Sequence, residues 1–240
     1  MKKNFYLFLI LLSTSLQFVS CTDEEVVDST ATVVHETEFN GGINGWSAVF
    51  AEYPKEDSAF YELRAGIEPL PAPLDQTKKS FMLSGNNHSD ALRMFLSKQL
   101  TGLAPSANYS VETEVELASM YPETSFGIGG SPGKAVHLVA KFATAGYTLK
   151  EGEERYDNVE LILNKVPSVP ESVLEIDLGD VSIPSEEFVY QLISRKKASA
   201  SNVVKSDAQG RLWAIVGTWS GFEGISTLYY TKIKITLTRR

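Results

Sequence analysis

The chain has 240 residues, of which 43% are hydrophobic and 22% charged, so it can bury a sizeable core and is not a mainly disordered protein. Its formal net charge of −8 disfavours nucleic acid as a partner, because the phosphate backbone would be repelled. A single cysteine excludes an internal disulfide framework and a cysteine-rich metal site. The three histidines have no metal-ligand spacing, so we predict no metal centre built from these residues.

Residues 1–20 have the organisation of a secretory signal peptide. Two lysines follow Met1, and the apolar run from Phe5 to Leu12 comes next. This run is too short to span a membrane, which takes about 20 apolar residues. The segment Phe18-Val19-Ser20-Cys21 that follows resembles a bacterial lipobox, although Phe18 stands where an aliphatic residue is usual. The resemblance implies cleavage before Cys21 and lipidation of Cys21, which would anchor the chain to a membrane.

Residues 21–32 are polar and acidic and are predicted to form a tether. The cluster Thr22-Asp23-Glu24-Glu25 resembles the export signal of surface-exposed lipoproteins in Bacteroidetes-type bacteria. That resemblance implies a location on the surface of the outer membrane. A solvated linker would have the same composition, and both interpretations can hold at once.

Residues 33–240 are predicted to form one domain of β-strands. Polar and apolar residues alternate in Glu112 to Leu117 and in Lys232 to Leu237, which is the period of half-buried strands. Further strands are predicted from their β-branched and aromatic content at residues 46–53, 60–63, 80–83, 92–96, 136–142, 159–163, 173–178, 188–193, 212–217 and 227–230. No segment has the pattern of a long amphipathic helix. The fold class predicted is therefore all-β, a single two-sheet β-sandwich or jelly roll.

Three short segments of this domain resemble galactose-binding-like jelly rolls, a fold found in many carbohydrate-binding modules. They are the glycine turn and tryptophan of Glu38 to Trp46, the corner of Leu100 to Tyr109, and the closing strand of Leu228 to Ile235. The resemblance implies that the first and last strands pair and that the ligand is a polysaccharide. It also implies a structural calcium between those strands, held by Glu38 and a closing acidic residue. Thr231 stands at the closing position, so the chain departs from the calcium pattern there.

A predicted connection from Ser84 to Asp90 concentrates groups that bind sugar hydroxyls. Asn86, Asn87 and Asp90 offer amides and a carboxylate, and His88 stands among them. Any turn would use the same residue types, so a ligand site and a plain turn both remain open.

Trp219 is the tryptophan expected to be exposed, because it lies in the polar run Thr218-Trp219-Ser220-Gly221. Trp46 and Trp213 are expected to pack in the core. The flat face of an exposed aromatic ring suits the CH face of a sugar. We therefore predict a ligand surface that combines Trp219 with the polar connection described above, provided that the two lie at the same end of the sandwich.

The glycine-rich segment Gly127 to Lys134 does not match a phosphate-binding loop. Ile128 stands where that motif requires glycine, and Ala135 stands where it requires Ser or Thr. A tight loop between strands is the better interpretation, and its glycines permit close backbone approach beside a ligand cleft.

Three functions remain open at the level of sequence. The first is a non-catalytic surface lipoprotein that binds glycan through its jelly roll. The second is an adhesion or assembly subunit that binds another protein. The third is a glycan-active hydrolase or lyase, for which acidic residues are abundant but no catalytic pair can be assigned.

Overall fold

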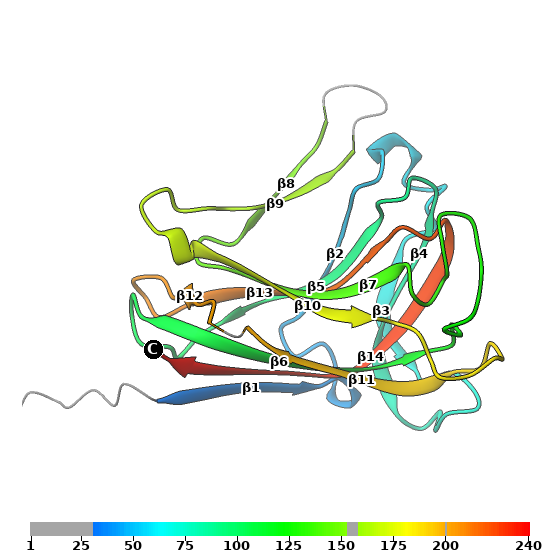
Figure 1. Ribbon diagram of the computed structural model, residues 1–240, viewed down its shortest axis with the longest axis horizontal. Helices are drawn as coiled ribbons and strands as arrows, with labels where there is room; N and C mark the ends of the chain where they lie inside the picture. The colour runs from blue at the N-terminus through cyan, green and yellow to red at the C-terminus, as the bar shows by residue number, and fades with distance from the viewer. Residues whose placement is uncertain (1–30, 153–157, 200) are drawn as a thin grey trace, which may run out of the picture.

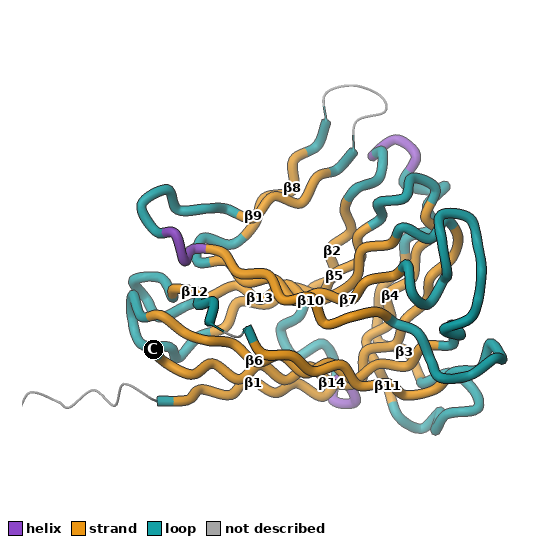
Figure 2. Tube along the Cα trace, in the orientation of Figure 1, coloured by secondary structure: helices purple, strands orange, loops and turns teal. Residues whose placement is uncertain are grey.

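The computed structural model describes residues 31–152, 158–199 and 201–240 (Figure 1). The signal peptide, the lipobox with Cys21 and residues 21–30 of the tether lie outside the described residues. Figure 2 shows strands throughout, with short 3₁₀ segments at η1 (Phe39–Gly41), η2 (Lys55–Asp57) and η3 (Pro170–Ser172). Within the described ranges, no helix has the length and apolar composition needed to cross a membrane.

Two antiparallel sheets pack face to face, so the predicted all-β sandwich is confirmed. The seven-stranded sheet contains β1 (Thr32–Glu38), β3 (Arg64–Pro69), β4 (Lys79–Asn87), β6 (Asn108–Ser119), β11 (Gln191–Ala198), β12 (Val204–Lys205) and β14 (Gly224–Arg239). The five-stranded sheet contains β2 (Ser47–Ala51), β5 (Arg93–Leu100), β7 (Val136–Ala143), β10 (Val173–Asp180) and β13 (Leu212–Ser220). A separate hairpin is formed by β8 (Tyr147–Lys150) and β9 (Glu160–Leu163).

The core lies between the two sheets because the side chains alternate along each strand. In β13, Leu212, Ala214 and Val216 belong to the large cluster between the sheets. Ile215 points the other way and packs with residues of β9 in a smaller cluster, so the β8–β9 hairpin covers part of the outer face of the five-stranded sheet. In Figure 1 this hairpin lies above the sheet and extends toward the upper right.

The long strand β14 pairs with β6 on one side and with two strands in succession on the other. Residues 224–230 pair with β4, and residues 232–238 pair with β1. The register with β6 shifts between Tyr230 and Lys232, so Thr231 is a bulged residue at the point where β14 changes its neighbour.

Two local predictions around β3 and β4 were wrong. Residues 60–63 form turns, and the strand begins only at Arg64. Gly85-Asn86-Asn87, predicted as a turn, belongs to β4. The glycine is needed for packing, since a Cβ at Gly85 would lie 2.8 Å from the Leu92 Cδ2 atom and 3.1 Å from the Met94 sulfur.

The close approach of β13 to β5 predicts that alanine destabilises the protein at one glycine, Gly217, and not at another, Gly66. A Cβ at Gly217 would overlap the Met94 carbonyl oxygen and lie 2.7 Å from Phe95 Cα, whereas a Cβ at Gly66 in β3 would meet nothing within 4 Å. We expect Gly217→Ala to lower the free energy of unfolding by about 2–4 kcal/mol. Gly66→Ala should leave it unchanged or raise it by up to about 1 kcal/mol. Urea denaturation of both variants tests this, and equal losses would contradict it.

Candidate functional site

Three connections meet at one end of the sandwich, which we call the loop end (right-hand side of Figure 1). They are residues 88–92, 120–135 and 221–223. A Cβ at Gly129 would overlap the Gly221 carbonyl oxygen and lie 2.7 Å from Asp90 Oδ1. The backbone of Gly129 has φ +71°, and the neighbouring Ile128 carbonyl accepts a hydrogen bond from Glu223 N at 2.9 Å. Only glycine permits this approach, so the glycine-rich segment brings the three connections together.

Tyr121 fixes the start of the 120–135 connection to β14. Its hydroxyl accepts a hydrogen bond from Thr227 N at 2.7 Å and donates one to the Ile225 carbonyl oxygen at 3.3 Å. Burial raises the pKa of this hydroxyl to about 12, so it stays neutral and keeps the donor that the second bond requires.

Trp219 lies at the end of β13 and faces away from the core. Its neighbours Thr218 and Ser220 are buried, whereas Trp219 is 38% exposed. Its ring stacks on that of His137, with 4.3 Å between centroids and 14° between planes. The polar run around Trp219 predicts a connection between strands, and this is wrong, because Trp219 pairs with Arg93 in β5 and His137 in β7.

Trp219 and Asp90 lie at the same end of the sandwich. A Cβ at Gly221 would lie 4.0 Å from Trp219 Cζ3 and 3.6 Å from the Gly129 carbonyl oxygen, and Gly129 in turn adjoins Asp90. The juxtaposition that the sequence left open is therefore present in the structure.

An ion pair supplies polar groups beside the tryptophan. Arg93 Nη1 lies 3.2 Å from Glu52 Oε1, and the Ser89 hydroxyl donates to the Glu52 carbonyl oxygen at 3.3 Å. Glu52 and Asp90 both have a left-handed backbone, with φ of +61° and +56°. Non-glycine residues in this region carry strain, which is common where a loop is shaped for binding.

The remaining predicted residues have different roles. Asn87 is buried, and its amide donates to the Ser220 and Phe222 carbonyl oxygens at 2.9 and 2.8 Å. Its own Oδ1 accepts from the backbone N–H groups of residues 89 and 92. Asn87 thus ties β4 to the turn after β13, and its polar atoms do not face solvent as a ligand contact would require.

Asn86 and His88 lie on the side of the loop end next to residues 58–64. Asn86 is half-buried and donates to Glu62 Oε1 at 3.0 Å. His88 is exposed and stacks on Phe60 with 3.8 Å between ring centroids. Phe60 is 62% exposed, so this pair forms a second aromatic surface at the loop end.

Glu52, Arg93 and His137 are part of this site but are not among the residues that the sequence predicts for it. Each lies on or next to a predicted strand, and nothing in its local sequence marks it as exposed. The strand register places Arg93 and His137 on either side of Trp219. Register depends on long-range pairing, so the local sequence does not reveal this arrangement.

The residues expected for calcium do not fit a dication. Glu38 pairs across the strands with Lys232, and the Thr231 hydroxyl donates to Glu116 Oε1 at 2.7 Å. Calcium takes six to eight oxygen ligands, and the closing strand offers no carboxylate opposite Glu38, only the Thr231 hydroxyl and a lysine at position 232. Among the residues that the structure describes, no group of three His, Cys, Asp or Glu side chains could hold a metal ion.

No family model and no curated protein matches the chain. Among solved structures, the K3 adhesin domain of Lys-gingipain from Porphyromonas gingivalis W83 is 9% identical, with a TM-score of 0.39 over 86% of this chain and 99% of that one. TmCBM61 in complex with β-1,4-galactotriose is 10% identical, with a TM-score of 0.36 over 82% and 92% of the two chains. The enzymatically active domain of tailspike protein 4 of bacteriophage CBA120 is 9% identical, with a TM-score of 0.34, and this chain covers 20% of its length. At these identities and TM-scores the similarity carries no argument about ligand or activity.

The buried amide of Asn87 predicts a stability effect that its neighbour lacks. We expect Asn87→Ala to lower the free energy of unfolding by about 2–4 kcal/mol, because buried backbone groups lose their partners. Asn86→Ala removes one bond at a half-buried position and should cost less than about 1 kcal/mol. Urea denaturation measures both, and a larger loss for Asn86→Ala would refute the structural role of Asn87.

Proposed function

We propose that this chain is a non-catalytic, lipid-anchored protein of the outer-membrane surface that binds glycan at its loop end. The observation that carries the glycan-binding part is the outward-facing Trp219 ring with charged groups beside it. The stacked His137 holds that ring in place, while Arg93, Glu52 and Asp90 offer both donors and acceptors nearby. An apolar face flanked by directional polar groups is the arrangement that a sugar ring requires.

The position of the termini supports display of this site away from an anchor. Thr32 pairs with Thr238 at one end of β14, and Gly224 begins β14 at the loop end. The sixteen residues of this strand span roughly 50 Å at about 3.3 Å per residue. A chain anchored by a lipid on Cys21 would therefore join the domain at the end opposite to the loop end.

The non-catalytic part of the proposal is supported by the bonding of two loop-end carboxylates. Glu52 is paired with Arg93, and Glu62 accepts a hydrogen bond from Asn86. A glycosidase needs one carboxyl group to donate a proton and a second to act as base or nucleophile, both facing the same sugar. Incubation of the protein with each glycan that it binds should release no reducing ends.

One observation favours protein binding as a second candidate. Phe126 and Ile128 are 95% and 72% exposed, and both lie in the 120–135 connection that hydrogen bonds and glycine contacts fix to the sandwich. Two rigidly presented apolar side chains suit an apolar patch on another protein. If glycan binding is retained in Phe126→Ala and lost in Trp219→Ala, the exposed apolar pair is not part of the glycan site, and the two candidate surfaces are distinct.

The glycan site is tested with Trp219→Ala in the detergent-solubilised chain. A glycan array first identifies the ligand, and calorimetry then measures its dissociation constant. We expect Trp219→Ala to weaken binding by about 5- to 150-fold, as the loss of roughly 1–3 kcal/mol of aromatic contact implies. Ile43→Ala is the control, because Ile43 is 50% exposed and precedes β2 at the end opposite to Glu52. Equal affinity in Trp219→Ala and the wild type would refute a loop-end site.

The membrane anchor is tested with Cys21→Ser. The substitution removes the single cysteine and with it the attachment site for acyl chains, so the protein should move from the membrane fraction to the soluble fraction. Fractionation followed by immunoblotting measures this. An unmodified Cys21 in the mass spectrum of the native protein would contradict the lipoprotein assignment.

A further inference from the structure

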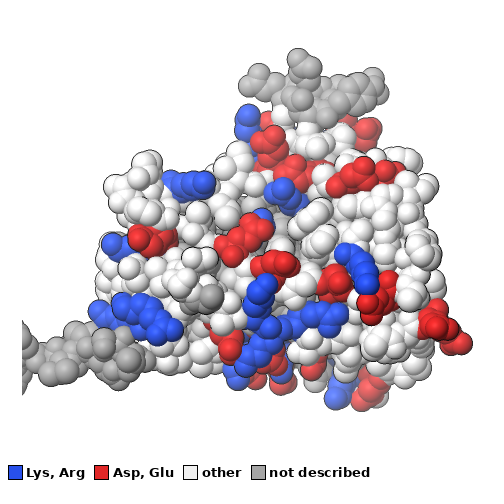
Figure 3. All heavy atoms as spheres, in the orientation of Figure 1, with Lys and Arg blue, Asp and Glu red and all other residues white. Residues whose placement is uncertain are grey.

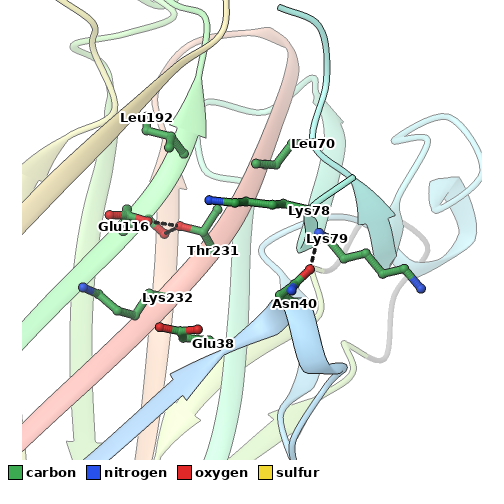
Figure 4. A pocket seen from close by; sticks show the side chains of 9 residues that line it. All are labelled: Glu38, Asn40, Leu70, Lys78, Lys79, Glu116, Leu192, Thr231 and Lys232. Carbon is green, nitrogen blue, oxygen red and sulfur yellow. Dashed lines mark hydrogen bonds between the residues drawn. The ribbon is translucent and has the colours of Figure 1, made fainter. Parts of the chain in front are cut away.

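A pocket of about 270 Å³ lies on the outer face of the seven-stranded sheet, away from the loop end. We call it the sheet-gap pocket (Figure 4). It is lined by Glu38, Asn40, Leu70, Lys78, Lys79, Glu116, Leu192, Thr231 and Lys232.

The pocket exists because β14 changes its neighbour at Thr231. Strand β4 begins at Lys79 and β1 ends at Glu38, so neither strand pairs with the bulged residue between them. The Thr231 hydroxyl donates a hydrogen bond to Glu116 of β6, where the backbone carbonyl oxygen and the carboxylate Oε1 of Glu116 both lie within bonding distance. The bulge therefore fixes a hydroxyl at the floor of an opening in the sheet.

Lys78 supplies the pocket with a cation. In Figure 4 its side chain reaches across the pocket toward Thr231, whereas Lys79 points its ammonium group away. Across the described part of the chain, no carboxylate lies within ion-pair distance of Lys78. Asp75, whose charge also acts on Lys78, has its carboxylate bonded to the hydroxyl and N–H of Thr77 at 2.6 and 3.1 Å.

Some of the other polar groups of the pocket are already bonded within the protein, and others remain available to a ligand. Lys232 is paired with Glu114 at 3.1 Å, outside the pocket. Asn40 accepts a hydrogen bond from Lys79 N through its Oδ1, which leaves its amide N–H₂ as a donor. The exposed Glu38 carboxylate offers an acceptor.

Apolar surface completes the lining. Leu70 is 2% exposed and Leu192 is 47% exposed, and both border the polar groups. A ligand of this pocket meets one free ammonium group, an amide donor, a carboxylate acceptor and two leucines.

Two lysines elsewhere on this face of the seven-stranded sheet are ion-paired. Lys196 bonds to Glu112 at 2.8 Å, and Lys234 bonds to Glu36 at 3.1 Å. Figure 3 shows blue and red side chains interleaved in the region where Figure 1 places β6 and β11. The unpaired Lys78 therefore differs from Lys196, Lys232 and Lys234, which are ion-paired.

From this arrangement we propose that the sheet-gap pocket binds one sugar unit that carries a carboxylate, a hexuronic acid. Its carboxylate pairs with the Lys78 ammonium group. Its hydroxyls bond to Asn40 and Glu38, and its CH groups contact Leu192. The site is separate from the loop end and does not depend on the function proposed above.

The test is a titration of the detergent-solubilised chain with D-glucuronate, followed by ¹H–¹⁵N NMR. D-glucose is the neutral probe of equal size, and acetate is the carboxylate without a ring. We expect glucuronate to shift the amide signals of Asn40, Thr231 and Lys232. Glucose and acetate should each have a dissociation constant at least about tenfold higher than that of glucuronate.

Two lysine variants identify the cation. Lys78→Gln should weaken glucuronate binding about tenfold, and Lys165→Gln, which removes the same charge from an exposed position elsewhere, should not. The proposal would be overturned if glucose or acetate bound as tightly as glucuronate, or if these amide signals did not shift. It would also be overturned if Lys78→Gln bound glucuronate as tightly as the wild type. Loss of glucuronate binding in Trp219→Ala with retention in Lys78→Gln would place the sugar at the loop end and also overturn it.

Discussion

The structure depends on the backbone hydrogen bonding of β14. This strand joins β6 along one side, while β4 and β1 share its other side. Two strands that follow each other along one edge leave a place where neither pairs, and the bulge at Thr231 lies at that place. The sheet-gap pocket, the position of Glu38 and the direction in which the chain enters the sandwich all follow from this pairing.

At the loop end, the limiting factor is how closely backbones can approach. Gly129 lies against Gly221 with no space for a side chain, and Gly127 similarly adjoins the Phe222 ring. The connections are therefore packed against one another, and the exposed groups beside them, Trp219 and Asp90, are held in fixed positions. Binding through such groups requires little ordering, which favours affinity.

The sequence predicted the fold well where the local pattern agreed with the tertiary structure. Residues 92–96 are predicted to be a strand from their composition, and β5 (Arg93–Leu100) confirms this. The exposure of Trp219 followed from its polar neighbours, but those neighbours are buried strand residues. The prediction therefore reached the correct exposure through an incorrect local structure.

Predictions failed where a residue acts through distant parts of the chain. Gly85 has the local sequence of a turn residue, and that sequence cannot show that Leu92 and Met94 pack against it. Asn87 has the composition of a surface turn, yet it bonds to carbonyl groups more than 130 residues away. The place of His137 beside Trp219 and the opening at Thr231 depend on register, which no local pattern encodes.

The antiparallel pairing of β1 with β14 has a mechanical consequence. If the chain is held at its N-terminal end and a ligand is pulled from the loop end, the force runs along the strands. The seven residue pairs from Thr32↔Thr238 to Glu38↔Lys232 form an antiparallel ladder, and the hydrogen bonds of such a ladder run perpendicular to that direction. They are then loaded in shear and must break together, whereas pulling apart the two strands from one end would break them one at a time.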